Sequence, residues 1–145
     1  MMTRSRRRPA RWAVPLAALV FAGLPAHAQT ADDAVGVWQH TENASQIELY
    51  KCGGALCGRI AKVGDNQTTD LNNPDPSKRG RPVVGLVILE EAQQSGPATW
   101  AGALYNRSDG RHYDGRLTVT GKDRLELTGC TAVIICRTVV WRRIR

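Results

Sequence analysis

The chain has only one phenylalanine among its 145 residues, and no stretch of it shows the 3.6-residue apolar spacing of an amphipathic helix. That residue, Phe21, lies in the first apolar run, so residues 29–145 must build a core from tryptophan, tyrosine and aliphatic side chains. The missing helical period argues against a helix bundle. The absence of an apolar run of about 20 residues argues against a membrane-spanning helix.

The residue patterns of common catalytic and metal sites are missing as well. The sequence has no Cys-x-x-Cys, and beyond residue 28 its two histidines, His40 and His112, stand in no recognisable motif. Oxygen-donor side chains gather between residues 65 and 75, but without the glycine and glutamate spacing of an EF-hand loop. We therefore predict no catalytic residue, no metal ligand and no cofactor, and we do not expect an enzyme.

The first 28 residues have the pattern of an export signal. Five arginines precede a short apolar run from Trp12 to Leu24, and Ala26-His27-Ala28 offers a small-x-small cleavage site. We expect a signal peptide over residues 1–28, cleavage before Gln29, and a single domain over residues 29–145 in the periplasm or outside the cell. An uncleaved membrane anchor is the alternative; after cleavage no transmembrane segment is expected.

The positive charge of the chain lies mainly in that leader. The full sequence has 20 basic and 13 acidic residues, a net charge of +7, and five of the arginines but no acidic residue fall within residues 1–28. Residues 29–145 therefore keep 15 basic and 13 acidic side chains, a net charge of +2. Such a near-neutral domain lacks the clustered basic surface of a nucleic-acid-binding protein, so we do not expect a nucleic-acid partner.

All four cysteines occur in two short segments, Cys52 to Cys57 and Cys130 to Cys136. In an oxidising compartment such cysteines form structural disulfides. Four cysteines allow three pairings. We predict Cys52–Cys57 and Cys130–Cys136, because each pair closes a short loop between the ends of neighbouring strands.

Apolar residues alternate with polar ones along most of the remaining chain, as in strands with one buried face. We expect an all-β fold with strands near residues 35–40, 45–51, 56–63, 83–90, 98–106, 111–119, 123–130 and 136–143. Glycine and aspartate turns separate several neighbours, which indicates antiparallel hairpins. Eight such strands favour a small up-and-down antiparallel barrel, because closure removes the exposed strand edges. A two-sheet sandwich is the alternative.

The exception to the short turns is a connector of about residues 64–82, rich in asparagine, aspartate and proline. Loops of this length are usually functional or mobile. The connector is a candidate recognition loop, and side chains within it that could contact a partner are Asp70, Asn72, Asn73, Asp75, Arg79 and Arg81. The simpler interpretation is that its Asn and Asp side chains bind their own backbone in successive turns.

An ordered set of short motifs resembles one bacterial exported family. The set comprises Gly36-Val37-Trp38, the segment from Ile47 to Ile60 that contains Cys52-Gly53-Gly54-Ala55-Leu56-Cys57, the segment from Asp70 to Pro76, and Trp141-Arg142. In this order they resemble the family called domain of unknown function 2147. The resemblance implies a small β-barrel of the bacterial envelope, and it supplies no catalytic residues.

A looser similarity to the calycin barrels, which include the lipocalins, comes from Gly36-Val37-Trp38. In those barrels a tryptophan of the first strand packs against an arginine of the last, so the similarity implies a stack between Trp38 and Arg142, with Arg143 as the alternative. An eight-stranded barrel is filled by side chains or holds one small ligand. We expect a binding module for a small ligand or an envelope protein; the alternatives are an enzyme with an unfamiliar site and a structural envelope component. Candidate ligand or core aromatics are Trp38, Tyr50, Trp100 and Tyr105.

Overall fold

The computed structural model describes residues 27–132 and 134–145. The signal peptide expected over residues 1–28 therefore lies almost entirely outside the described residues. Within the described ranges, no helix has the length and apolar character needed to cross a membrane. The elements are two 3-10 helices, η1 (Ala31–Ala34) and η2 (Pro76–Lys78), and eight strands: β1 (Gly36–His40), β2 (Gln46–Cys52), β3 (Ala55–Lys62), β4 (Val87–Gly96), β5 (Thr99–Asn106), β6 (Arg111–Gly121), β7 (Arg124–Ala132) and β8 (Ile135–Arg143).

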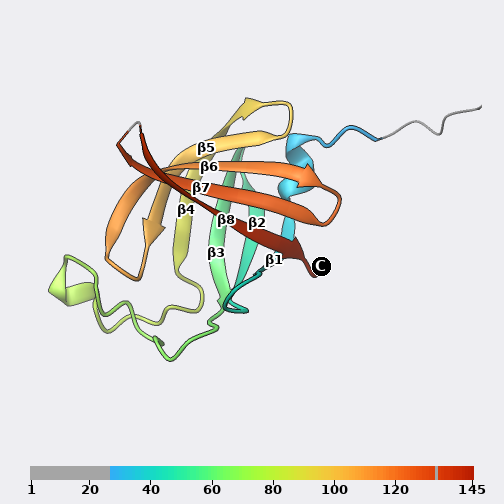
Figure 1. Ribbon diagram of the computed structural model, residues 1–145. Helices are drawn as coiled ribbons and strands as arrows, with labels where there is room; N and C mark the ends of the chain where they lie inside the picture. Colours follow the sequence, from blue (N-terminus) through green and yellow to red (C-terminus); the bar gives the residue numbers. More distant parts are fainter. Residues whose placement is uncertain (1–26, 133) are drawn as a thin grey trace, which may run out of the picture.

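The eight strands form one closed barrel in which each strand pairs with the next along the chain (Figure 1). Every pairing is antiparallel, and β8 returns to β1 with Trp38 opposite Arg143 and His40 opposite Trp141. This topology confirms the predicted up-and-down barrel and rules out the two-sheet sandwich. Because closure pairs both edges of the sheet, none of the eight described strands has a free edge for pairing with another chain.

The up-and-down order gives the barrel two different ends. At one end, η1 lies beside the β2–β3, β4–β5 and β6–β7 turns; this is the closed end. At the other end lie the β1–β2, β5–β6 and β7–β8 turns and the connector between β3 and β4; this is the open end (Figure 1).

The closed end holds the main hydrophobic core. Trp38, Trp100, Leu56, Leu117 and Leu125 are almost completely buried there, since alternate residues of each strand point inward. The two indoles fix η1 in place: Trp38 Nε1 donates to the Ala34 carbonyl at 2.8 Å and Trp100 Nε1 to the Ala31 carbonyl at 2.7 Å. The 3-10 helix thus acts as a plug whose carbonyl oxygens satisfy two buried donors.

The predicted strand positions agree with the structure except for the fourth. We expected a strand over residues 83–90, whereas β4 begins at Val87 and ends at Gly96. Gly85 has a φ of +88°, which ends extended pairing, and Val83 instead donates its N–H to the Thr68 carbonyl within the connector. Past Glu90, register shifts and the positive φ of Glu91 interrupt the alternation that would have revealed the strand.

Both predicted disulfides are present in the structure. Cys52 is bonded to Cys57 across the β2–β3 turn at the closed end, and Cys130 is bonded to Cys136 across the β7–β8 hairpin at the open end. Cys130 and Cys136 are direct partners in the strand register, with their Cα atoms 4.1 Å apart. No free cysteine occurs among the described residues.

The arginine that stacks on Trp38 is Arg143, and the prediction of Arg142 was wrong. The Arg143 guanidinium lies 4.2 Å from the centroid of the Trp38 ring. It also donates to the carbonyl oxygens of Val35 and Lys122 at 2.8 and 3.0 Å, and to that of Asp33. The reason is the two-residue period of β8: Arg143 shares the inner face with Trp141, while Arg142 is exposed on the other face.

Candidate functional site

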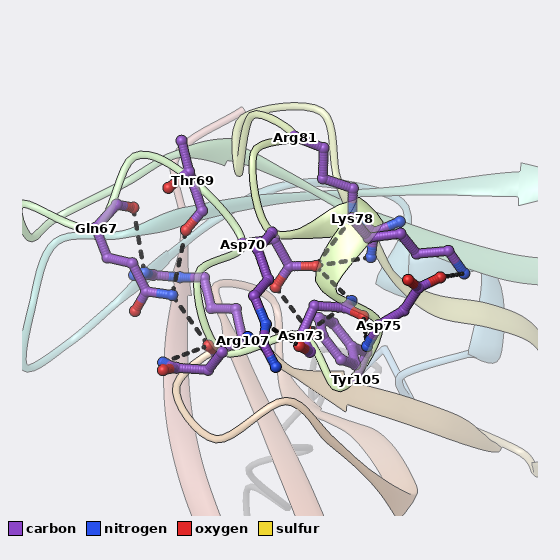
Figure 2. Close-up of polar contacts among 11 residues, drawn as sticks. Gln67, Thr69, Asp70, Asn73, Asp75, Lys78, Arg81, Tyr105 and Arg107 are labelled. Carbon is purple, nitrogen blue, oxygen red and sulfur yellow. Dashed lines mark hydrogen bonds and ion pairs between the residues drawn. The ribbon is translucent and has the colours of Figure 1, made fainter.

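The connector is held against the barrel by a buried polar cluster centred on Asp70 (Figure 2). The Asp70 side chain is completely buried and accepts hydrogen bonds from the Tyr105 hydroxyl at 2.6 Å and from Asn73 Nδ2 at 2.7 Å. Arg81 completes the cluster, with Nε and Nη2 at 2.9 and 2.8 Å from the same carboxylate. A carboxylate removed from water is stable only when it is paired and hydrogen-bonded, and these contacts meet both conditions.

The cluster also changes the acidity of two of its members. Burial alone raises the pKa of Asp70, but the hydrogen bonds from Tyr105, Asn73 and Arg81 outweigh it and leave the pKa below its ordinary value. The pKa of Tyr105 is raised, first by burial and then by the hydrogen bond to the Asp70 carboxylate. At neutral pH the cluster therefore holds a carboxylate and a protonated tyrosine.

A second set of contacts joins the connector to the β5–β6 turn. Asn72 Nδ2 donates to the carbonyl oxygens of Arg107 and Ser108 at 3.2 and 2.9 Å, and Arg107 forms an ion pair with Asp65 at 2.6 Å. The backbones of the connector and of the β5–β6 turn lie very close together here. A Cβ on Gly110 would lie 1.9 Å from the Asn72 carbonyl oxygen, and Gly110 has a φ of +71°. Only glycine fits at this crossing.

These contacts place the residues predicted for the recognition loop. Asp70, Asn73 and Arg81 are used in the buried cluster, and Asn72 ties the connector to the β5–β6 turn. Asp75 caps η2 by accepting from the Ser77 N–H, and Arg79 Nε donates to the Asn73 carbonyl. Each side chain thus has a partner within the chain. Asn73 and Asp75 accept backbone N–H groups of their own turns, as the simpler interpretation predicts, whereas Asp70 and Asn72 bind residues outside the local turn. Recognition through this loop stays a prediction.

The open end of the barrel contains a cavity of about 550 Å³, which we call the cup. Its wall is apolar on the inner faces of the strands and polar around the mouth. The apolar residues are Ile47, Ile60, Ile88, Leu104, Leu127, Ile135, Val139 and Trp141, and the polar ones include His40, Asn106, Arg107, Tyr113, Thr131 and Arg137.

The inner face carries a glycine beside the cup, where the closed end carries tryptophan and leucine. Gly129 lines the cup, and Gly115 lies next to it across the β6–β7 pair. A Cβ added to Gly129 would make only ordinary contacts, 3.5 Å from Tyr113 Cβ and 3.6 Å from Leu104 Cδ2. A methyl group therefore fits at Gly129, in van der Waals contact with the side chains of Tyr113 and Leu104.

Of the four aromatics proposed as ligand contacts, only Tyr105 lines the cup. Trp38 and Trp100 belong to the core of the closed end, and Tyr50 lies under the Arg59 guanidinium, 5.2 Å from ring centroid to carbon. The aromatic residues that sequence reasoning did not propose are Trp141 and Tyr113. The alternation of Val139 and Trp141 was a usable signal, because it places both on the inner face of β8.

Neither histidine forms a catalytic pair among the described residues. His40 lines the cup, and its Nδ1 accepts the Glu42 backbone N–H at 3.0 Å. His112 lies against Tyr105, with ring centroids 5.1 Å apart. No hydrogen bond joins either ring to a carboxylate in the part of the chain that the structure describes, nor does that part contain a cluster of three metal-binding side chains.

A second cavity, of about 580 Å³, lies between the connector and strands β4 to β6. Its charged lining residues are of both signs and are mostly paired. Asp75 and Lys78 are 3.8 Å apart, and Arg81 is bound to Asp70. This cavity offers fewer free groups and less apolar wall than the cup, so the cup is the better candidate site.

The plugged barrel with a hollow open end defines a lipocalin-like protein. A solved structure from Helicobacter pylori, described as "Protein HP1028 from the human pathogen Helicobacter pylori belongs to the lipocalin family", is similar to it. The TM-score is 0.69 at 25% sequence identity, over 77% of this chain and 82% of that one. The curated proteins contain no match.

Residues 36–143 match the family described as "Uncharacterized protein conserved in bacteria", the domain of unknown function 2147, and the chain belongs to this family. The family predicted from the order of the short motifs is thereby confirmed. The matched range covers all eight strands, from the first residue of β1 to the last of β8.

Proposed function

We propose that this protein is a non-enzymatic binding module that holds one small, largely apolar ligand in the cup. The observation that carries the proposal is the contrast between the two halves of one barrel. The closed half is filled with large side chains, whereas the open half leaves about 550 Å³ between apolar walls.

The size and lining of the cup support this proposal. Small-molecule sites are concave, mostly apolar and roughly 300–1,000 Å³ in volume, with a few polar groups that orient the ligand. Eight-stranded barrels of the lipocalin type hold one small ligand inside. Burying apolar ligand surface against Leu104, Leu127 and Val139 would stabilise a complex by roughly 25 cal/mol per Å² before the cost of association.

We further propose that the protein works outside the cytoplasm. Two disulfides in a domain of this size fit an oxidising compartment, and the family is bacterial. In the periplasm the cup would take up a ligand from an aqueous space, which suits a barrel with a polar rim. N-terminal sequencing of the processed protein tests the expected cleavage before Gln29; a chain that still begins at Met1 or Met2 contradicts it.

The binding test fills the cup from within. Gly129→Leu places a leucine side chain in the cup without a backbone clash, so it should abolish binding of the neutral fluorescent probe N-phenyl-1-naphthylamine. The matched control is Gly54→Leu, since a Cβ on Gly54 meets nothing within 4 Å and lies in the β2–β3 turn at the closed end. Probe binding that survives Gly129→Leu, or is absent from the wild-type protein, contradicts the proposal.

Binding of an envelope protein is the second candidate function, and one feature favours it. Ile134 and Ile135 are 88% and 65% exposed at the tip of the β7–β8 hairpin, which the Cys130–Cys136 disulfide holds at the mouth of the cup. Exposed apolar groups at a rigid site often mark contact surfaces. Cross-linking in the envelope with wild-type protein and an Ile134→Ser, Ile135→Ser variant tests it: loss of a specific adduct supports a partner, and an unchanged pattern argues against one.

A further inference from the structure

We infer that the His40–Trp141 pair is where the cup recognises its ligand, by donating hydrogen bonds to an acceptor oxygen of a carbonyl or carboxylate group. This inference rests on the proposed function and names the chemistry of the ligand. Both residues line the cup, and they face each other across the β1–β8 pairing that closes the barrel. Their rings meet edge to face, with centroids 4.9 Å apart and planes at 76°.

Trp141 provides the first donor. Its side chain is 6% exposed, and its Nε1–H is buried without a hydrogen-bond partner among the described residues. The other two described tryptophans differ: the indole N–H groups of Trp38 and Trp100 both donate to carbonyl oxygens of η1. Buried donors without a partner are rare, because each loses its bonds to water and gains none in return.

His40 provides the second donor. Its Nδ1 accepts the Glu42 N–H, so in the neutral ring the proton resides on Nε2. The neutral form is the relevant one, since burial lowers the pKa of His40 and outweighs the opposite effect of the Glu42 carboxylate. The pair therefore carries two N–H groups that have no acceptor among the described residues, in side chains that line the same cavity as Ile47, Leu127 and Val139.

Two donors in an apolar cavity select for acceptors. A carbonyl or carboxylate oxygen at this point would satisfy the Trp141 N–H and receive a second bond from His40, while the chain of the ligand lies against the apolar wall. A ligand that carries only donors would leave Trp141 unpaired and would bury its own donors as well. Selectivity of this kind is strong because an unmatched buried polar group loses its full hydration.

The test compares three probes with similar ten-carbon chains, each used below its micellar concentration: decanoate, decan-2-one and decylammonium. The ketone separates the effect of an acceptor from that of charge. We expect wild-type protein to bind decanoate and decan-2-one more tightly than decylammonium. In ¹⁵N-tryptophan spectra both acceptors should move the indole N–H signal of Trp141, which the spectrum of Trp141→Phe identifies, and leave those of Trp38 and Trp100 in place.

The variant measures the contribution of the donor. Trp141→Phe keeps an aromatic ring beside His40 and should weaken decanoate and decan-2-one about 3- to 10-fold, with decylammonium changed less than about twofold. If the variant does not fold, the order of the three probe affinities in wild-type protein decides the question. Equal affinity for all three probes with an unmoved Trp141 signal overturns the inference and leaves the proposed function standing; failure of every probe to bind overturns both.

Discussion

Arg142 and Arg143 are neighbours in sequence, and the pleat of β8 sends their side chains to opposite faces. Arg143 contacts Trp38 and three backbone carbonyl oxygens at the closed end, whereas Arg142 is exposed. The three carbonyls belong to η1, to the residue after it, and to the β6–β7 turn. One guanidinium therefore joins the N-terminal plug to the last strand and to a hairpin that precedes it.

We predict that Arg143→Ala lowers the free energy of unfolding by about 1–3 kcal/mol, because it removes a cation–π contact and a set of charge-assisted hydrogen bonds. Arg143→Lys should recover only part of the loss, since an ammonium cannot reproduce the planar fork. Urea unfolding measures both. The control is Arg142→Ala, with an expected change within about 0.5 kcal/mol; equal effects of the two alanine variants would contradict the assignment.

Asp70 is the residue whose charge matters most to the connector. We predict that Asp70→Asn lowers the free energy of unfolding at pH 7 by about 2–4 kcal/mol, because Arg81 loses its buried partner and Tyr105 loses a charged acceptor. Asp114→Asn is the matched control, since Asp114 is exposed and forms no ion pair among the described residues.

The same substitution predicts a pH dependence. The pKa of Asp70 is lowered in the folded state, so its contribution is complete above the unfolded value near 4 and is lost as the pH falls through the lower folded value. The difference in stability between wild type and Asp70→Asn should therefore be constant from about pH 5 to 7 and shrink below about pH 4. A difference that grows on acidification would show that the carboxylate is not stabilised as described.

Among the elements, the two disulfide-closed hairpins act at opposite ends of the barrel. Cys52–Cys57 closes the β2–β3 turn beside the filled core, and Cys130–Cys136 holds the hairpin that forms one wall of the cup. Both close short loops, so each limits the unfolded chain to a similar extent. Only the second bridge supports residues of the candidate site.

We predict that replacing either cysteine pair with serine lowers the free energy of unfolding by about 2 kcal/mol. Only the Cys130→Ser, Cys136→Ser variant should also weaken binding of N-phenyl-1-naphthylamine, because loss of this disulfide frees the β7–β8 hairpin at the mouth of the cup. Thermal unfolding and probe titration of the two variants provide the comparison. Equal effects on binding would mean that the hairpin does not form part of the site.

At the scale of the whole molecule, the barrel is asymmetric along its axis. The closed half is packed around Trp38, Trp100 and η1, and the open half surrounds the cup and is covered at one side by the connector (Figure 1). Stability and binding are thus assigned to different halves of one continuous sheet. The closed half can supply most of the folding free energy while the open half stays available to a ligand.

This asymmetry predicts different costs for the same substitution. Leu125→Ala in the filled half should lower the free energy of unfolding by about 3–5 kcal/mol, because Leu125 is fully buried and its removal leaves a cavity. Leu104→Ala in the wall of the cup should cost about 1 kcal/mol, since Leu104 is only partly buried and already borders open space. Urea unfolding of both variants tests it, and equal costs would mean that the cup is filled in solution.

The sequence alone determined the elements that depend on local rules. The two-residue alternation of residues such as Leu125 and Leu127 predicted strands, the glycine turns predicted hairpins, and the close cysteine pairs predicted both bridges. These features involve residues near one another along the chain, so their spacing is enough. The family followed from the order of short motifs. The fourth strand was misplaced because its bulges and the positive φ of Glu91 erase the alternation.

Tertiary structure decided the features that need residues from distant strands. The alternation along β8 places Arg143 on the inner face, but that it meets Trp38 depends on the register of β1 against β8. The Asp70 cluster depends on the path by which the connector returns to Tyr105. Whether the barrel interior contains a cavity such as the cup depends on the total volume of the side chains that several strands direct inward. A local sequence pattern does not predict this total volume, because a glycine such as Gly129 leaves empty space only if side chains of the neighbouring strands do not fill it.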